Sequence, residues 1–339
     1  MKRNVLTGKV VLITGGIGSI GSEIVRQSLE QGAKKIIVFS RDEIKHFMMR
    51  KKISDDRLET IVGDVRDLRS VEQAVSRFDI DILYHAAAMK HVVMCEDFPL
   101  EAVQTNILGT QNVVDLALKY KIPKTITIST DKAAYPVNVM GAAKFIAEKI
   151  TLNANRVSIE EQAFSCVRFG NVASSRGSVI PAYIENLLNH KPLQVTDYEV
   201  TRFVMAIPEA VSLVIKSTEY AQGGEVFILK MEAFKLGDLV DVMINRIAPS
   251  LNISKNDIKV NITGLVPGEK LHEDLISDTE SSRLYELEDM YVLLLDNESS
   301  VKYPSIAKAS LCRYASSDVE LISKDEIEQI VVKYLEGRA

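Results

Sequence analysis

An acid and an amine stand side by side at Asp131 and Lys132, directly after a short apolar segment (residues 125–129, TITIS) that is typical of a buried strand. In parallel sheets, the carboxyl ends of the strands face the ligand crevice. There the two residues could work as general acid and general base, provided that the site moves their pKa values toward neutrality. Thr130 precedes them, and Lys144 follows twelve residues after Lys132. A solvated charge pair at the end of a strand is the alternative interpretation.

A glycine-rich turn, TGGIGSIG, follows the first apolar segment and opens a helical one. Its glycines include Gly15, Gly18 and Gly21, a spacing that allows a tight turn and lets backbone amides approach a pyrophosphate. The N-terminus of the helix adds amide donors and a dipole that favours an anion. We therefore predict a dinucleotide site at this turn, with Ser19 and Ile20 among its contacts.

The end of the second predicted strand indicates which dinucleotide binds. Enzymes that use NAD usually place an Asp or a Glu there, which accepts a hydrogen bond from the ribose 2′-hydroxyl. This chain has Ser40 and Arg41, and a hydroxyl beside a guanidinium suits the 2′-phosphate of NADP. Asp42, one residue later, keeps NAD as the alternative. We expect further cofactor contacts after the third and fourth strands, at Asp64, Val65, Ala86 and Ala87.

Strand-like and helix-like segments alternate through the first half of the chain. We predict strands at 9–14, 35–39, 58–62, 81–86, 125–129 and 165–169, with helices between them. Apolar strands separated by helices indicate a parallel sheet covered on both faces, so the predicted fold is a Rossmann-like, doubly wound α/β sheet. A smaller substrate-binding domain would be built from inserted C-terminal segments. We place the NADP-binding domain at 1–170 plus about 200–230, and the substrate-binding domain at about 171–199 plus 231–339.

Composition and charge exclude several classes of protein. The 339 residues are 46% hydrophobic and 26% charged, which is ordinary for a globular protein and excludes a disordered chain. A formal net charge of −5 argues against a nucleic-acid partner, which needs a basic surface. No apolar run approaches the ~18 residues of a spanning helix, so we expect no membrane insertion. Three widely spaced cysteines predict reduced thiols, no metal site and a cytoplasmic location.

Nine segments, in chain order, resemble the UDP-N-acetylglucosamine 4,6-dehydratases of the extended short-chain dehydrogenase/reductase superfamily. They are TGGIGSIG, FSRDE, GDVRD, HAAAMKHV, TNILGTQNV, STDKAAYPVNVMGAAK, VRFGNV, SRGSVIP and PGEKLHE, and the similarity runs from about residue 5 to about residue 276. The resemblance implies a UDP-sugar substrate, tightly bound NADP and a homo-oligomer. It also implies oxidation at sugar C4, elimination of water across C5 and C6, and return of the hydride to C6.

The resemblance implies a role for each residue after the fifth strand. Lys132 would remove the C5 proton, and Asp131 would protonate the departing C6 hydroxyl. Thr130 and Lys144 would flank the C4 hydroxyl and the nicotinamide ribose. Contacts to the substrate would come from Lys90, Asn171, Arg202 and Glu269.

Two positions depart from the pattern of these relatives. The superfamily uses Tyr-x-x-x-Lys, but Met140 takes the place of the tyrosine here, and a thioether cannot act as a base. Part of the dehydratase family looks the same, so another group must take the C4 proton: Asp131 through Thr130 or a water, or Tyr135. Val266 replaces the usual Arg before Pro-Gly-Glu-Lys, which leaves the contact to the UDP diphosphate open.

Two other functions remain as alternatives. A nucleotide-sugar epimerase on the same fold would act at C4 or C5, but it needs no acid for a C6 hydroxyl, so Asp131 and Lys132 favour dehydration. A non-catalytic NADP-binding sensor would explain the loss of the tyrosine. Such a sensor has no need of Asp131, Lys132 and Lys144 together.

Overall fold

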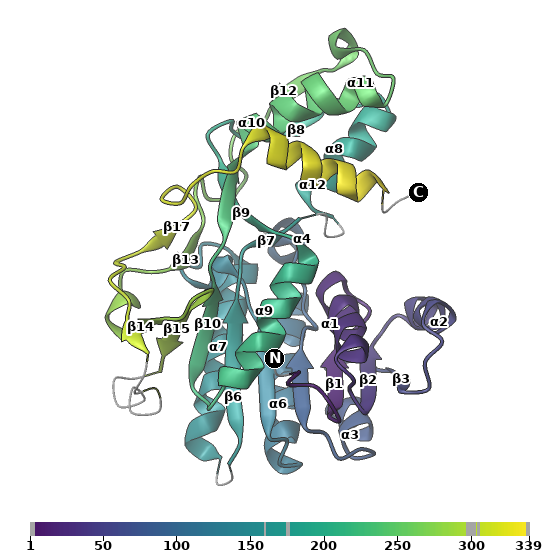
Figure 1. Ribbon diagram of the computed structural model, residues 1–339, viewed down its shortest axis with the longest axis vertical. Coiled ribbons are helices and arrows are strands. Elements are labelled where there is room, and N and C mark those ends of the chain that lie inside the picture. Colours follow the sequence, from purple (N-terminus) through teal and green to yellow (C-terminus); the bar gives the residue numbers. More distant parts are fainter. Residues whose placement is uncertain (1–3, 159–160, 174–176, 296–302, 304–305, 337–339) are drawn as a thin grey trace.

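The computed structural model describes residues 4–158, 161–173, 177–295, 303 and 306–336 (Figure 1). A ten-stranded sheet in the order β16-β14-β15-β10-β6-β5-β4-β1-β2-β3 forms its larger body. The parallel strands are β1 (Val10–Thr14), β2 (Lys35–Ser40), β3 (Leu58–Val62), β4 (Ile82–His85), β5 (Lys124–Ile128), β6 (Ala163–Arg168) and β10 (Glu225–Leu229).

Helices cover both faces of this sheet because successive side chains of a strand point to opposite faces. In β1, Leu12 packs in one core cluster with Val113 of α6, whereas Val11 packs in another with Ile24 of α1. The helices of the larger body are α1 (Ser19–Glu30), α2 (Glu43–Lys52), α3 (Leu68–Val75), α4 (Val92–Asp97), α5 (Pro99–Ala102), α6 (Gly109–Lys119), α7 (Val139–Val157) and α9 (Ile207–Tyr220). The predicted doubly wound α/β fold class is confirmed.

Three antiparallel strands extend the sheet beyond β10, and the sequence pattern did not indicate them. They are β14 (Leu284–Glu286), β15 (Met290–Leu294) and β16 (Ala307–Lys308). No helix separates β14 from β15, so the alternation that revealed the other strands does not reach them. Residues 231–339 therefore contribute strands to the large sheet as well, while the division into two domains stays a prediction.

A second core cluster forms a smaller body, here called the upper module, above the sheet in Figure 1. Ile184, Leu193, Leu239 and Val331 are buried at its centre. Its elements are α8 (Val179–Leu188), β8 (Leu193–Val195), α10 (Leu236–Val242), α11 (Ala248–Ser250), β12 (Val260–Ile262) and α12 (Lys324–Glu336). The strands β7 (Asn171–Val172), β9 (Thr201–Met205), β11 (Glu232–Lys235), β13 (Asp274–Ile276) and β17 (Tyr314–Ala315) lie between the two bodies.

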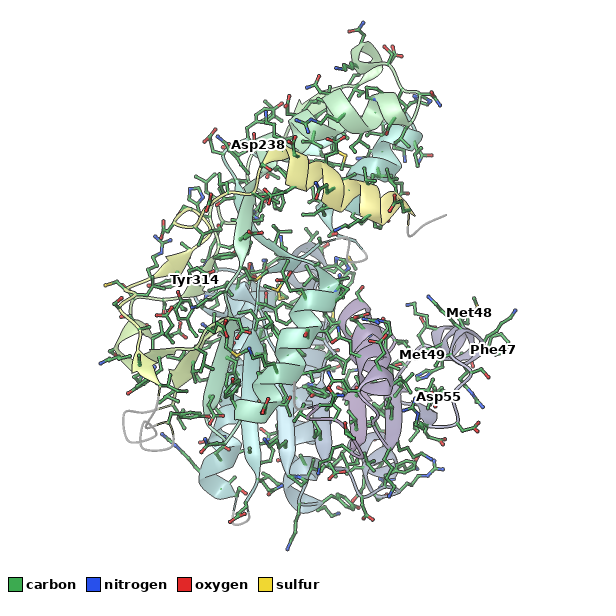
Figure 2. All side chains as sticks on the ribbon, viewed as in Figure 1. Phe47, Met48, Met49, Asp55, Asp238 and Tyr314 are labelled. Carbon is green, nitrogen blue, oxygen red and sulfur yellow. The ribbon has the colours of Figure 1, made fainter. Side chains whose placement is uncertain are left out.

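The surface carries exposed apolar side chains at one edge of the larger body. Figure 2 shows Phe47 and Met48 there, on α2, and both side chains are exposed. Within the part of the chain that the structure describes, no helix combines the length and the apolar character that crossing a membrane requires.

Candidate active site

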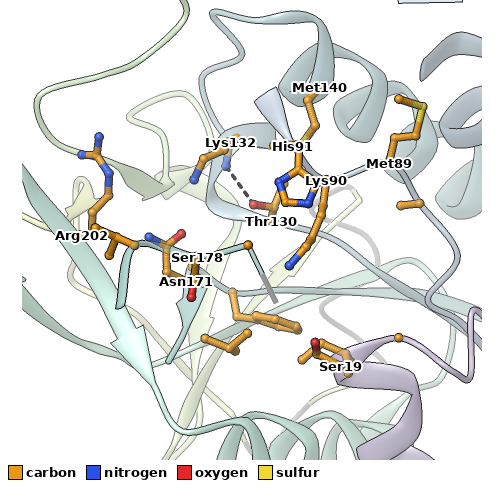
Figure 3. A pocket seen from close by; sticks show the side chains of 18 of the residues that line it. Ser19, Met89, Lys90, His91, Thr130, Lys132, Met140, Asn171, Ser178 and Arg202 are labelled. Atoms are coloured by element: carbon orange, nitrogen blue, oxygen red, sulfur yellow. Dashed lines mark hydrogen bonds between the residues drawn. The ribbon is translucent and has the colours of Figure 1, made fainter. Parts of the chain in front are cut away.

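A cavity of about 860 Å³ lies between the carboxyl ends of the parallel strands and the upper module (Figure 3). Its walls come from the segments that follow β1, β4, β5 and β6, and from residues of α8, β8 and β9. These four strands are neighbours in the sheet, so the polar residues at their ends meet at one edge. This edge is where ligands bind in open α/β sheets.

The glycine turn between β1 and α1 forms one wall of the cavity. The lining residues here are Gly15, Gly18, Ser19, Ile20 and Gly21, the turn at which the sequence predicts a dinucleotide site. Gly15 has a φ of +68°, and a Cβ atom there would lie 2.7 Å from the Ala87 amide nitrogen. A Cβ on Gly21 would come within 2.4 Å of the Gly15 carbonyl oxygen. Only glycine fits these positions, so the turn packs closely against the end of β4 and against α1, and it places the N-terminus of α1 at the cavity wall.

The end of β2 differs in part from the prediction. Ser40 and Arg41 do not line the cavity. The Ser40 hydroxyl lies 2.7 Å from His46 Nε2, and Arg41 Nη1 lies 3.7 Å from Asp64 Oδ2. Asp42, the residue that kept NAD as an alternative, caps α2: its carboxylate accepts a hydrogen bond from the Lys45 backbone N–H at 3.0 Å.

The remaining predicted cofactor residues divide into two groups. Asp64 forms an ion pair with Arg66 at 2.6 Å and does not line the cavity. Val65 is buried in the core beside α6 and does not line it either, because its side chain packs on the sheet. Ala86 lines the cavity. Ala87 does not, and its backbone amide packs against Gly15.

Asp131 begins a 3₁₀ turn directly after β5 and is completely buried. Its N–H donates to the Phe169 carbonyl at 3.1 Å, which fixes the turn against the end of β6. Its Oδ1 accepts hydrogen bonds from the Thr130 hydroxyl at 2.6 Å and from the Lys132 ammonium at 3.0 Å. Thr130 and Lys132 line the cavity, and Asp131 does not. A proton can therefore pass between Asp131 and the cavity through its two neighbours.

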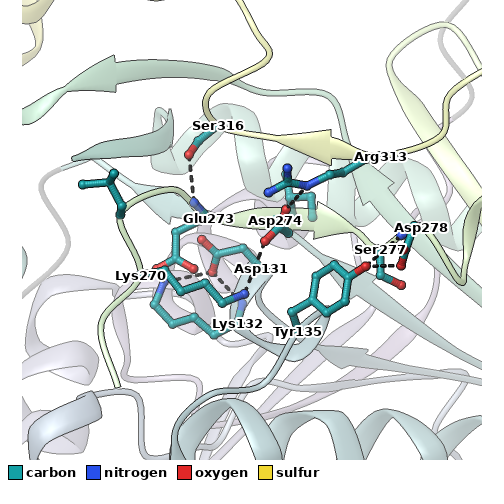
Figure 4. Close-up of polar contacts among 12 residues, drawn as sticks. Asp131, Lys132, Tyr135, Lys270, Glu273, Asp274, Ser277, Asp278, Arg313 and Ser316 are labelled. Atoms are coloured by element: carbon teal, nitrogen blue, oxygen red, sulfur yellow. Dashed lines mark hydrogen bonds and ion pairs between the residues drawn. The ribbon is translucent and has the colours of Figure 1, made fainter. Parts of the chain in front are cut away.

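Lys132 lies between two carboxylates (Figure 4). Its Nζ is 3.0 Å from Asp131 Oδ1 and 3.3 Å from Glu273 Oε1. Burial disfavours the charged amine, but the carboxylates of Asp131 and Glu273 outweigh burial and the opposing charge of Arg202, so the pKa of Lys132 lies above its usual value. The amine therefore carries a proton at neutral pH and must lose it before it can act as a base.

Lys144 and Met140 lie one helical turn apart on α7, and both line the cavity. The Lys144 ammonium donates to the Ile128 carbonyl at the end of β5. Burial lowers the pKa of Lys144, although Cys166 and Glu148 oppose the shift. Met140 is nearly buried and packs with Cys95. The wall thus presents a thioether at the position where the superfamily has a phenol.

Tyr135 does not provide the missing phenol. Its hydroxyl donates to the Asp278 carboxylate, outside the cavity lining (Figure 4). The hydrogen bond to Asp278 raises the pKa of Tyr135, which makes the phenol a weaker acid. The geometry therefore disfavours Tyr135 as the predicted acceptor of the C4 proton and leaves the other prediction, Asp131 through Thr130 or a water.

The four residues that the resemblance assigns to the substrate all line the cavity. Lys90 and Arg202 lie on either side of Lys132 in the view of Figure 3, with Asn171 between them. Arg202 donates to Glu269 Oε1 at 2.7 Å, so these two residues form one charged unit at the wall. Val266, where the relatives usually have an Arg, does not line the cavity.

Several residues of the site were not among those predicted, although His91, Ser178 and Glu273 lie within segments that carry the resemblance. Lys45, His91, Ser178 and Gln194 line the cavity, and Glu273 lies behind Lys132. Lys45 had a usable signal, since it stands on the first turn of the helix that follows the NADP-indicating segment. The others stand far from the glycine turn and the Asp-Lys pair, and only folding brings them there.

Comparisons with known proteins agree on one family. The pattern of the family described as "Polysaccharide biosynthesis protein" matches residues 11–294. An uncharacterized membrane protein of Methanocaldococcus jannaschii is 42% identical over 335 residues, which covers 98% of each chain. A UDP-glucose 4-epimerase of Rickettsia bellii is 35% identical over 96% of this chain and 95% of the relative. A UDP-N-acetylglucosamine 4,6-dehydratase (inverting) of Campylobacter jejuni is 39% identical over 86% of each.

A solved structure shows the same architecture. The X-ray structure of Pen from Bacillus thuringiensis matches with a TM-score of 0.89 and 37% identity, over 97% of this chain and 98% of that one. The likeness covers both the sheet and the upper module.

Proposed function

This chain belongs to the polysaccharide biosynthesis protein family, and we propose that it dehydrates UDP-N-acetylglucosamine. The product would be a UDP-4-keto-6-deoxy-N-acetylhexosamine for a surface polysaccharide or glycan. Relatives are named both as nucleotide-sugar dehydratases and as epimerases, so the choice between the two reactions depends on the site. The observation that carries the proposal is the buried Asp131 carboxylate, joined to the cavity through Thr130 and Lys132. A cytoplasmic location and a homo-oligomer stay predictions.

The residues of the cavity fit a nicotinamide dinucleotide. The bare glycine turn would hold the pyrophosphate, and Lys144 would contact the nicotinamide ribose. Lys45 lines the cavity and Arg41 follows the end of β2, and two cations at this place suit the 2′-phosphate of NADP. Asp42 is already engaged as a helix cap, which supports the same choice. When bound, the nicotinamide would take the hydride from sugar C4 and return it at C6.

Thr130 and Asp131 would move one proton from the C4 hydroxyl to the C6 oxygen. As C4 is oxidised, the C4 hydroxyl gives its proton to Thr130 Oγ1, which passes its own to the Asp131 carboxylate at 2.6 Å. Asp131 then holds the proton that the C6 oxygen needs in order to leave as water. The path runs back through the same hydroxyl, so Met140 needs no proton chemistry of its own.

Lys132 would move a second proton at C5. The 4-ketone makes the C5 proton acidic. The Lys132 ammonium first releases its proton to water, and the neutral amine then removes the C5 proton while the C6 oxygen departs. After the hydride reaches C6, the Lys132 ammonium returns a proton to C5. The balance closes: one hydride moves from C4 to C6, one proton moves from O4 to O6, and Lys132, which takes back a proton from water, ends as it began. The face of C5 that receives the proton decides between retention and inversion.

An epimerase on the same fold is the second candidate. A relative named as a UDP-glucose 4-epimerase aligns over nearly the full length. An epimerase that acts at C4 needs a base there but no acid for a leaving C6 hydroxyl. Mass distinguishes the two reactions, since only dehydration removes a water from the sugar.

Substitution of Lys132 tests the assignment. Lys132→Ala should slow product formation by about 10²-fold or more, because the reaction loses its C5 base. Bound nucleotide should remain, since the glycine turn is untouched. Lys270→Ala is the matched control, because Lys270 stands over the Tyr135 ring, pairs with Asp274 and lies outside the cavity lining. Unchanged turnover in Lys132→Ala would remove Lys132 from the mechanism.

A further inference from the structure

Glu273 is a buried carboxylate directly behind Lys132, and neither the sequence pattern nor the proposed chemistry assigns it a role. Its Oε1 lies 3.3 Å from Lys132 Nζ. The same ammonium group also contacts Asp131 (Figure 4). Glu273 does not line the cavity, so it can act on the substrate only through a neighbour that does, and Lys132 at 3.3 Å is closer to it than Arg202 at 4.0 Å. We propose that Glu273 is a positioning residue, which holds the Lys132 side chain at the cavity wall and stabilises the ammonium that forms when Lys132 takes the C5 proton.

The backbone of Glu273 is fixed on both sides. Its N–H donates to the Ser316 hydroxyl at 2.9 Å, and the Ser316 N–H donates to the Glu273 carbonyl at 2.8 Å. The Ser316 hydroxyl also lies 2.7 Å from the Thr201 hydroxyl at the start of β9. Glu273 therefore has a fixed position relative to β9 and β17, and its carboxylate lies beside the amine of Lys132, which stands on the 3₁₀ turn after β5.

The surroundings of the Glu273 carboxylate make Lys132 its principal partner. The residue is 3% exposed, and its Oε2 has no hydrogen-bond partner among the described residues. Oε1 lies 4.0 Å from Arg202 Nε, but the Arg202 guanidinium donates to Glu269 at 2.7 Å. A buried carboxylate with a free oxygen is costly unless it pairs with a charge. The ion pair with Lys132 supplies that charge.

Glu273 becomes necessary at one step of the proposed reaction, on which this inference rests. When Lys132 removes the C5 proton, Asp131 has already received the C4 proton and is neutral. Until Asp131 has passed that proton to the C6 oxygen, it does not stabilise a positive charge on Lys132. The Thr130 hydroxyl donates to Asp131 and not to Glu273, so the proposed relay does not protonate Glu273, whose carboxylate faces the new ammonium. The two carboxylates around Lys132 thus have different tasks: Asp131 carries a proton, and Glu273 carries a fixed charge.

Few charged groups surround the Lys132 amine, so the effect of Glu273 can be isolated. Asp131 on its own turn and Glu273 before β13 face the amine, and Arg202 approaches from β9. The next acidic residue, Asp274, is equally buried but pairs with Lys270 at 3.4 Å and with Arg313 at 2.6 Å. Asp274→Asn therefore removes the same charge from the same segment without touching Lys132.

The test titrates the Lys132 amine by NMR, in protein labelled with ¹³C at the lysine Cε atoms. Lys132→Gln identifies the signal. Glu273→Gln should move the midpoint of this titration down by about one pH unit or more, because the amine loses one of two close carboxylates. Glu273→Asp should lie between wild type and Glu273→Gln, and Asp274→Asn should match wild type. An unmoved midpoint in Glu273→Gln, or an equal shift in Asp274→Asn, would overturn the inference.

Turnover gives a second readout of the same variants. The neutral amine is the active base, so the rate of C5 proton exchange with deuterium oxide should rise with pH through the Lys132 pKa. In Glu273→Gln this rising limb should move to lower pH together with the NMR midpoint, and its plateau should fall at least tenfold. A limb and plateau that match wild type would contradict the positioning role. The NMR midpoint could move in Glu273→Gln while the wild-type protein neither exchanges the C5 proton of the sugar nor removes water from it. That result would support the ion pair between Glu273 and Lys132 and contradict the proposed function.

Discussion

Thr130 separates a fully buried carboxylate from the cavity, and the proposed chemistry passes through its single hydroxyl. Oγ1 donates to Asp131 at 2.6 Å while the residue lines the cavity. Met140 stands where a phenol would otherwise take the C4 proton. The other residue of α7 that lines the cavity is Lys144, and its ammonium already donates a hydrogen bond to the Ile128 carbonyl. Both steps that move the O4 proton therefore depend on Thr130.

Thr130→Val should separate Asp131 from the substrate. The variant keeps the shape of the side chain but has no hydroxyl to relay a proton, so product formation should fall by about 10²–10⁴-fold. Thr130→Ser restores the hydroxyl and should retain most of the activity. Rates of formation of the 4-keto sugar measure the effect, and a Thr130→Val enzyme as fast as Thr130→Ser would contradict the relay.

At the scale of elements, the turn between β1 and α1 combines two requirements. Gly15 needs a left-handed backbone, and it also needs the absence of a Cβ where Ala87 approaches. Gly8 provides a natural comparison: its φ is +73°, but a Cβ there would meet nothing within 4 Å. The two glycines share the backbone conformation and differ in the crowding around them.

Gly15→Ala should therefore lower the free energy of unfolding more than Gly8→Ala does. A left-handed alanine alone costs about 1–2 kcal/mol, and Gly15→Ala adds a backbone clash that displaces the turn from the pyrophosphate position. We expect Gly8→Ala to retain bound nucleotide and Gly15→Ala to lose it. Urea unfolding and the nucleotide released on denaturation measure both effects. Equal stability and equal nucleotide content in the two variants would exclude the clash at Gly15.

The elements that sequence reasoning located are those with strong local patterns. The apolar strands β1 to β6 and the glycine turn were placed correctly because each is a contiguous segment with its own signal. The side chains at the ends of β2 and β3 were harder to predict. The sequence places cofactor contacts there, at Ser40, Arg41, Asp64 and Val65. Contacts with nearby residues keep these side chains out of the cavity lining. Glu273 stands at the end of the PGEKLHE segment, but its role could not be predicted, because that role depends on a contact with Lys132 on the distant turn after β5.

At the scale of the molecule, two bodies enclose one cavity. The sheet supplies the glycine turn, Thr130 and Lys132, whereas β9 and the segments beside it supply Arg202 and Glu269. In the proposed function, groups for the cofactor and for proton transfer would thus come from the sheet edge, and groups for the nucleotide half of the substrate would come from the opposite side. This division matches a reaction in which a long nucleotide sugar lies across the cavity with its hexose above the ends of β5 and β6.

The most direct test of the whole account is to incubate the purified protein with UDP-N-acetylglucosamine, without added cofactor, and to follow the nucleotide sugar by mass spectrometry and NMR. We predict the loss of one water and the appearance of a 4-keto-6-deoxy sugar, because the hydride leaves and returns within one turnover on NADP that stays bound. The C5 signals would then report retention or inversion. An unchanged mass with a new sugar configuration, or no reaction even with NADP and NAD supplied, would contradict the account.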